Sequence, residues 1–173
     1  KTAQYKLTVK TPSVKLNASA KTLYVKGSPA TVTLKATTAG VTGKVTYTSS
    51  KPSVAAVAAN GKVTAKAAGT AVITAKCGNY KATCKITVKK PTVKASASAK
   101  TVFVGGTSQI KVEKTGVSGK VTYTSSNKSV AVVSAGGKVT AKKAGTATIT
   151  VKCGSYKATC RITVKKGSLK ITS

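Results

Sequence analysis

The feature that most constrains this chain is an internal repeat. The segment GKVTYTSS at 43–50 returns unchanged at 119–126, and CGNYKATCKITVKK at 77–90 returns as CGSYKATCRITVKK at 153–166. Both pairs of segments have the same offset of 76 residues. Self-similarity at a fixed period is the signature of tandem copies of one structural unit. The 173 residues therefore hold two small units in place of one large domain.

The two ends of the chain also match parts of the repeat. Lys6-Leu7-Thr8-Val9-Lys10 matches 85–89, and Ser168-Leu169-Lys170 resembles 92–94. We therefore expect an excerpt from a longer array, although both ends could instead be extra edge strands. In the first interpretation, the chain divides into the last strand of a preceding repeat at 1–10, repeat 1 at 11–89, repeat 2 at 90–166 and the start of a following repeat at 167–173.

Alternating apolar and polar residues predict β-strands, and no stretch shows a helical period. In 71–77, Ile73 shares one face with the other apolar residues at odd positions, whereas Val72 points the other way. The second copy supports this assignment, because Val72 becomes Thr148 while Ile73 remains an isoleucine, Ile149. The segments 44–48, 62–66 and 84–89 alternate in the same manner.

Turn residues separate these strands. Asn60-Gly61 and its counterpart Gly136-Gly137 suit a tight hairpin turn that needs positive φ, and Gly78-Asn79 and Gly154-Ser155 mark another turn. Half-buried strands joined by such turns indicate an all-β fold, an antiparallel β-sandwich of roughly 76 residues per unit.

These strand and turn segments resemble those of a known family. The stretch TYTSSKPSVAAVAANGKVTAKAAGTAVITAK at 46–76, with its partner at 122–152, is similar to the bacterial immunoglobulin-like group 2 (BIG2) family through its SVAxV, GKVTA and AGTAxIT segments. The resemblance implies two tandem immunoglobulin-like β-sandwich domains. It also implies an extracellular or cell-surface location, since members are typically tandem modules of bacterial and phage surface proteins. This chain departs from the family in its near lack of acidic residues, so no acidic contact of its relatives carries over.

The cysteines form two C-x6-C pairs, Cys77 with Cys84 and Cys153 with Cys160. Alternation places both members of each pair on the inner face, and we expect a structural disulfide within each repeat, formed in an oxidising compartment. A two-residue turn at Gly78-Asn79 would instead set Cys84 opposite Ile73, too far from Cys77 to bond. In that case the thiols are free and buried.

The composition argues against an enzyme or a metal centre. The chain has no histidine, and Glu113 is its one acidic residue. General acid–base catalysis mostly uses His, Asp or Glu, and a catalytic thiol needs a histidine base. A zinc site generally needs four ligands, more than the two thiolates of each repeat, and a calcium site normally needs carboxylates. We therefore expect no catalytic residue, no metal and no cofactor.

The net charge is +30, with 31 Lys and Arg residues against one acid. Such a charge attracts polyanions, although lysines on alternate strand positions also keep β-proteins soluble. Lysine lacks the planar fork of arginine and stacking aromatic residues are few, so sequence-specific nucleic-acid binding is not expected. The candidate polyanion contacts are Lys76, Lys85, Lys89, Lys90, Lys152, Lys165 and Lys166.

Two functions follow from these patterns. The first is a non-catalytic structural or adhesive repeat module of an extracellular bacterial surface protein, stalk or filament, whose partners are neighbouring repeats of the same chain or further copies of it. The alternatives are a lysine-rich binding module for anionic polymers (cell-wall polymer, acidic polysaccharide or DNA without sequence preference) and a phage surface decoration module. No run of about 18 apolar residues occurs, so no membrane span is expected.

Overall fold

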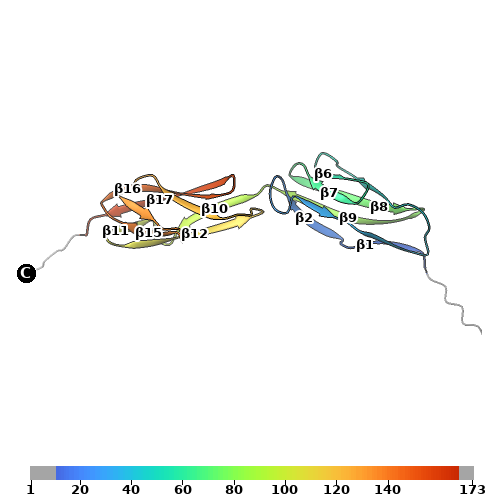
Figure 1. Ribbon diagram of the computed structural model, residues 1–173, viewed down its shortest axis with the longest axis horizontal. Coiled ribbons are helices and arrows are strands. Elements are labelled where there is room, and N and C mark those ends of the chain that lie inside the picture. Colours follow the sequence, from blue (N-terminus) through green and yellow to red (C-terminus); the bar gives the residue numbers. More distant parts are fainter. Residues whose placement is uncertain (1–10, 168–173) are drawn as a thin grey trace, which may run out of the picture. The chain divides into compact units, whose positions relative to one another are not determined.

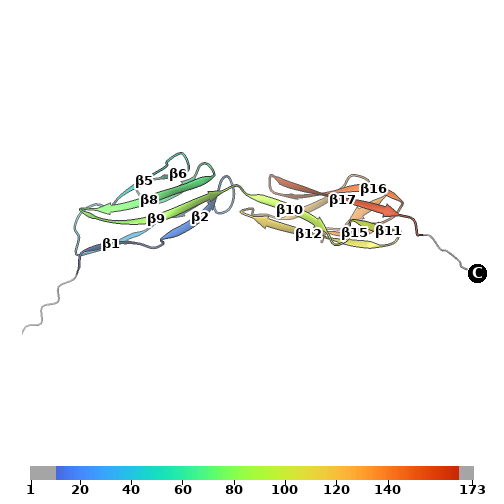
Figure 2. The same cartoon turned by 180° about the vertical axis from the view of Figure 1, so that it is seen from behind.

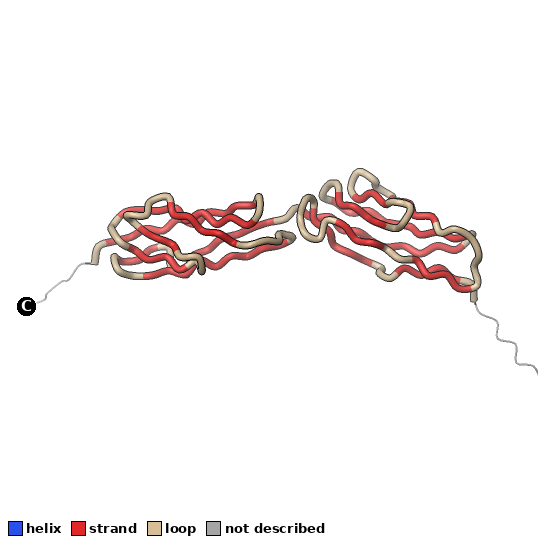
Figure 3. Tube along the Cα trace, viewed as in Figure 1, coloured by secondary structure: helices blue, strands red, loops and turns tan. Residues whose placement is uncertain are grey.

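The computed structural model describes residues 11–167, and it divides into two compact units, Lys1–Lys90 and Pro91–Ser173. The described residues form strands, turns and loops, without a helix (Figures 1 and 3). The predicted strand at 1–10 and all but the first residue of the predicted segment 167–173 lie outside the described residues.

The first unit folds into three small sheets (Figure 2). One has the order β2-β9-β8-β5, a second the order β3-β7-β6, and β1 pairs with β4. The strands are β1 (Ser13–Leu16), β2 (Ala20–Tyr24), β3 (Thr31–Thr33), β4 (Ala36–Ala39), β5 (Thr46–Ser49), β6 (Ala55–Val57), β7 (Lys62–Ala65), β8 (Gly69–Cys77) and β9 (Tyr80–Lys89).

The second unit repeats this arrangement in two four-stranded sheets, β11-β17-β16-β13 and β10-β12-β15-β14. Its strands are β10 (Thr92–Ala97), β11 (Thr101–Phe103), β12 (Thr107–Thr115), β13 (Val121–Ser125), β14 (Ala131–Val133), β15 (Lys138–Ala141), β16 (Gly145–Cys153) and β17 (Tyr156–Lys165).

The two units differ where the continuous β12 replaces the separate β3 and β4. Between β3 and β4 the side chain of Asn17 takes the place of a backbone partner, because the Lys35 N–H donates to Asn17 Oδ1 at 3.0 Å. The second unit has Ser96 at the corresponding position, and there the ladder between β10 and β12 continues without a break, with Ser96 opposite Lys111. The interruption of the strand thus coincides with the side-chain hydrogen bond of Asn17.

Not every strand pair is antiparallel. In each unit the second strand pairs in parallel with the last one, β2 with β9 and β11 with β17. The alternation pattern predicted the strands and the all-β sandwich correctly, but it gave no sign of this parallel pair. A parallel pair joins segments distant in the sequence and leaves no local signature such as a hairpin turn.

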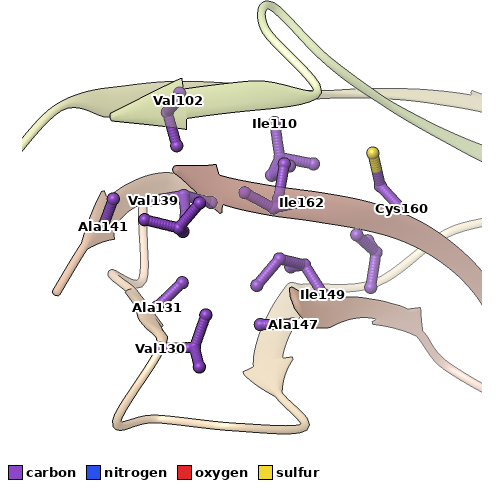
Figure 4. Close-up of a cluster of buried hydrophobic side chains, with 12 residues drawn as sticks. Val102, Ile110, Val130, Ala131, Val139, Ala141, Ala147, Ile149, Cys160 and Ile162 are labelled. Atoms are coloured by element: carbon purple, nitrogen blue, oxygen red, sulfur yellow. The ribbon is translucent and has the colours of Figure 1, made fainter. Parts of the chain in front are cut away.

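The core of each unit is made of the inward positions predicted by alternation. In the second unit Val139, Ile149 and Ile162 converge from different strands between the two sheets (Figure 4). In the first unit Ile73 is fully buried, whereas its neighbour Val72 is 37% exposed. The predicted in-and-out pattern of this strand is therefore confirmed.

The hairpin between β6 and β7 requires a glycine at its last turn position. Gly61 has φ of 78° and Gly137, at the corresponding place, has φ of 80°. The turn is longer than a two-residue hairpin turn, because the Ala58 N–H donates to Lys62 O and the Gly61 N–H donates to Ala58 O, both at 2.9 Å. At Gly137 a Cβ atom would lie 2.9 Å from Cζ of Tyr123 and 3.1 Å from Nε2 of Gln109.

Substituting alanine at the two adjacent glycines of the second hairpin is expected to have different effects. Gly137→Ala should lower the free energy of unfolding by about 1–3 kcal/mol, because it combines positive φ with a crowded Cβ. Gly136→Ala should change it little, since the position is open and Asn60 occupies its counterpart. Chemical denaturation of the two variants measures the difference, and equal stabilities would show that the turn does not require the left-handed conformation.

Candidate polyanion-binding surface

The outer face of the sheet β2-β9-β8-β5 carries alternating threonine and lysine side chains. On β9 the residues Cys84, Ile86 and Val88 point into the core, so the residues between them face solvent. The ladder between β8 and β9 sets Thr70 opposite Thr87 and Thr74 opposite Thr83. The face is therefore polar and rich in hydroxyl groups, with positive charge along it.

The corresponding sheet of the second unit repeats this surface. Thr146 lies opposite Thr163 and Thr150 opposite Thr159. Three outward positions differ: Val72 is replaced by Thr148, Lys85 by Arg161 and Tyr24 by Phe103. The first two changes keep or increase the polarity of the face, whereas Phe103 lacks the hydroxyl group of Tyr24.

The structure places each predicted lysine on the exterior. Lys76, Lys85 and Lys89 point outward from the first unit's sheet, and Lys152 and Lys165 point outward from the second's. Lys90 and Lys166 directly follow the last strand of each unit and are also exposed.

These predicted lysines do not form one cluster. Lys85 lies opposite Val72 on one side and Ala20 on the other. Lys89 lies opposite Tyr24, and its counterpart Lys165 lies opposite Phe103. Residues four apart on one strand are separated by about 13 Å. The predicted candidates therefore remain separate candidate contacts.

Sequence analysis overlooked four lysines that the fold brings next to two of the candidates. Lys81 lies directly opposite Lys76 in the β8–β9 ladder, and Lys157 lies directly opposite Lys152 in the β16–β17 ladder. Lys44 and Lys120 precede β5 and β13, on the same face by alternation. Pairing residues outward from a two-residue turn at Gly78-Asn79 predicts Lys76 opposite Lys81, and the same holds for the second unit. The sequence did not fix the length of that turn, so both lysine pairs were missed.

Within the described part of the chain, one ion pair offsets this positive charge. Every lysine between residues 11 and 167 is exposed to solvent. Glu113, the one acidic residue, lies on β12 with its Oε1 atom 3.8 Å from Lys111 Nζ. Both side chains are largely exposed, so this ion pair contributes little to stability. The outer sheet faces retain their full positive charge.

The predicted disulfides are wrong, because all four cysteines are free and buried. Gly78-Asn79 forms a two-residue turn that sets Cys77 opposite Tyr80 and Cys84 opposite Ile73. Cys77 and Cys84 thus lie four ladder positions apart, too far to bond. Cys153 and Cys160 are separated in the same way. The alternative of free, buried thiols is the one that the structure shows.

The thiols occupy two kinds of buried position. Cys77 Sγ donates to Gly43 O at 3.4 Å, and Cys153 Sγ donates to Gly119 O at 3.3 Å. Cys84 packs in the core beside Ile73, its partner in the β8–β9 ladder, and burial raises its thiol pKa against the opposing effect of the Lys21 ammonium. A raised pKa keeps the folded thiol neutral. The stability that the neutral Cys84 thiol contributes is fully present below its unfolded-state pKa. It is lost as the pH rises through the folded-state pKa of the thiol.

Thiol labelling checks this assignment directly. Alkylation of unreduced protein in denaturant should add four labels per chain, whereas native protein at neutral pH should label slowly, because buried neutral thiols are poor nucleophiles. A reducing agent should leave the thermal midpoint unchanged. Two or fewer labels in denaturant without reductant would show that disulfides form.

The comparisons with known proteins identify the fold. The bacterial Ig-like domain family matches residues 43–90, and the bacterial Ig-like domain family of group 2 matches residues 87–172. The chain belongs to the bacterial immunoglobulin-like domains. The match confirms the resemblance inferred from the GKVTA and AGTAxIT segments. No curated protein matches this sequence.

Among solved structures, this bacterial immunoglobulin-like chain is similar to parts of an S-layer protein. The crystal structure of the S-layer protein rSbsC(31-844) aligns with a TM-score of 0.53 and 25% identity, over 92% of this chain and 28% of that one. SbsC domains 4 and 5 align with a TM-score of 0.52 and 25% identity, over 90% and 98%. The SbsC fragment of domains 4–9 is 28% identical with a TM-score of 0.50, over 90% and 30%.

Bacterial immunoglobulin-like domains are typically non-catalytic. A hollow of about 330 Å³ in the second unit has Lys128 as its one charged group, and its lining consists of Tyr123, Thr124, Ser125, Lys128, Val132 and Val133. Among residues 11–167, no three potential metal ligands of the His, Cys, Asp and Glu types gather. None of the described elements is a helix that could cross a membrane.

Proposed function

We propose that the two units are non-catalytic structural repeats of an extracellular bacterial surface protein, part of a longer array in a layer, stalk or filament. The observation that carries this proposal is the alignment of more than nine-tenths of the chain with the S-layer protein rSbsC at 25% identity. The chain spans 28% of that protein's length, which fits an array of which this chain is one portion.

The path of the chain through each unit supports a structural role. In the first unit the chain enters where β1 begins and leaves at the opposite end, where β9 finishes (Figures 1 and 2). The second unit is entered at β10 and left at β17 in the same manner. Tension on the two ends of a unit then acts along the strands and loads several ladder hydrogen bonds at once, including the parallel pair of β2 with β9.

A second role is binding to an anionic polymer of the cell surface, and the charge of +30 favours it. Lysine side chains that have no acidic partner in the protein retain their attraction for external anions. The two roles are compatible, since a structural repeat that contacts an anionic wall polymer also holds the array against the cell.

Antibody labelling of intact cells tests the proposed location. An antibody raised against residues 11–167 should label intact cells of the native source as strongly as permeabilised ones. A cytoplasmic protein antibody, which should label only permeabilised cells, serves as the control. Labelling that appears only after permeabilisation would overturn the proposed surface location.

A further inference from the structure

One feature of the outer sheet faces is electrostatically unfavourable and occurs twice. Lys76 lies directly opposite Lys81, and Lys152 lies directly opposite Lys157. Within the described strands, these are the two places where a ladder sets lysine against lysine; other ladder lysines face neutral residues or Glu113. Directly opposed residues have Cβ atoms about 5 Å apart, and like charges at that spacing destabilise a sheet.

No carboxylate among residues 11–167 lies beside either pair to offset this repulsion. The one carboxylate side chain belongs to Glu113 on β12, in the other sheet of the second unit. Lysine is not required by the strand structure here, because threonine occupies the next outward positions on both strands, with Thr74 opposite Thr83. Both units nevertheless have the lysine pair at the same place, while other outward positions on the same strands changed between the copies.

Further polar and charged side chains surround each pair, although the Thr46 hydroxyl donates to Lys76 O at 3.4 Å. Thr46 lies on the other side of Lys76, in the β5–β8 ladder, and Lys44 precedes it on the same face. The second unit has Thr122 opposite Lys152, with Lys120 before it. Neighbouring strands are about 4.8 Å apart, so the three side chains from three strands span about 10 Å. We name these sets the lysine clusters, defined as Lys44, Thr46, Lys76 and Lys81 in the first unit and Lys120, Thr122, Lys152 and Lys157 in the second.

We propose that each lysine cluster is a binding site for a tetrahedral oxyanion group, a phosphate or sulfate ester, of an anionic polymer. This inference rests on the proposed binding of anionic polymers and assigns its site. An anion between the two ammonium groups removes their repulsion and accepts hydrogen bonds from both. The ammonium groups act as mobile point charges, which suit an oxyanion with several acceptor oxygens better than a planar carboxylate, for which arginine provides the matching fork.

A pair of matched variants tests the site. The test variant removes the opposed lysines of both units, with Lys76→Gln, Lys81→Gln, Lys152→Gln and Lys157→Gln. The control variant removes four exposed lysines from β7, β15 and the residues just after them, with Lys62→Gln, Lys66→Gln, Lys138→Gln and Lys142→Gln. Both variants lose the same charge from equivalent positions of both units, so attraction by net charge alone affects them equally.

The first measurement is binding of long-chain polyphosphate at low salt. We expect the test variant to bind at least about tenfold more weakly than the wild type, with a shallower salt dependence, and the control variant to bind within about twofold. Equal losses in the two variants would overturn the site. Dextran sulfate as a parallel probe distinguishes the sources of the oxyanion, since preference for one polymer identifies a phosphate or a sulfate ligand.

A second measurement reports on the site without a polymer. Inorganic phosphate should raise the thermal midpoint of the wild type and of the control variant more than sodium chloride at equal ionic strength does, because it binds the folded clusters. The test variant should respond less to phosphate than the control variant does, and should keep only the general stabilisation that phosphate gives any folded protein. An equal phosphate effect in the test and control variants would contradict the proposal. If the wild type itself binds neither polymer, the anionic-polymer role fails as a whole, a result distinct from equal losses in the two variants.

Discussion

Replacing Ile73 by alanine is expected to lower the free energy of unfolding of the first unit by about 2–5 kcal/mol. Ile73 is fully buried on β8 and packs in the core with Leu23, Leu34 and Val63. Few large side chains fill this core, which otherwise consists mainly of valine and alanine, so the neighbours have little freedom to close the cavity. Since small domains are stable by only about 5–15 kcal/mol, the loss is a large fraction of the total.

The neighbouring residue provides the matched control. Val72→Thr introduces the side chain that the second unit has at the same place, Thr148, on an exposed face. Its effect should lie within about 0.5 kcal/mol, as for ordinary surface substitutions. Urea denaturation of both variants, followed by circular dichroism, measures the difference. Similar losses in the two variants would mean that the in-and-out assignment of β8 is incorrect.

The sequence predicted the sandwich because period-two alternation is a local signal. The repeat then provided an independent check, since Val72 and Thr148 vary where Ile73 and Ile149 do not. The parallel pairing of β2 with β9 could not be predicted in this way. It joins Leu23 to Val88, and only the packed unit brings these residues together.

Predicting both the state of the cysteines and the lysine clusters required the length of one turn, which the sequence did not determine. With two residues in the turn, Cys84 lies opposite Ile73 and Lys81 lies opposite Lys76. Gly78-Asn79 indicated a turn but did not fix its length. Disulfides were therefore expected, with free thiols as the alternative, and Lys81 was overlooked. Once the turn is known, the strand register determines both the free thiols and the lysine pairs.

Binding to DNA should be strong at low salt, independent of sequence and lost steeply as salt increases. With six to ten phosphates contacted, affinity for a duplex should fall about 10³–10⁵-fold between about 50 and 200 mM salt, because each contact releases condensed counterions. Duplexes of unrelated sequence should bind alike, since Arg161 is the only arginine and few aromatic residues are present.

Fluorescence anisotropy with two labelled duplexes of different sequence, measured at several salt concentrations, tests this expectation. A neutral dextran of similar length should show no binding under the same conditions. Affinity that is insensitive to salt, or that differs widely between the two duplexes, would contradict binding by exposed lysine charge.

Membership of these repeats in an assembled cell-surface structure is tested by electron microscopy of the protein isolated from its native source, combined with its intact mass. We expect a chain much longer than 173 residues, present in a regular layer, stalk or filament. A discrete soluble protein of this length, without any assembly at the cell surface, would contradict it.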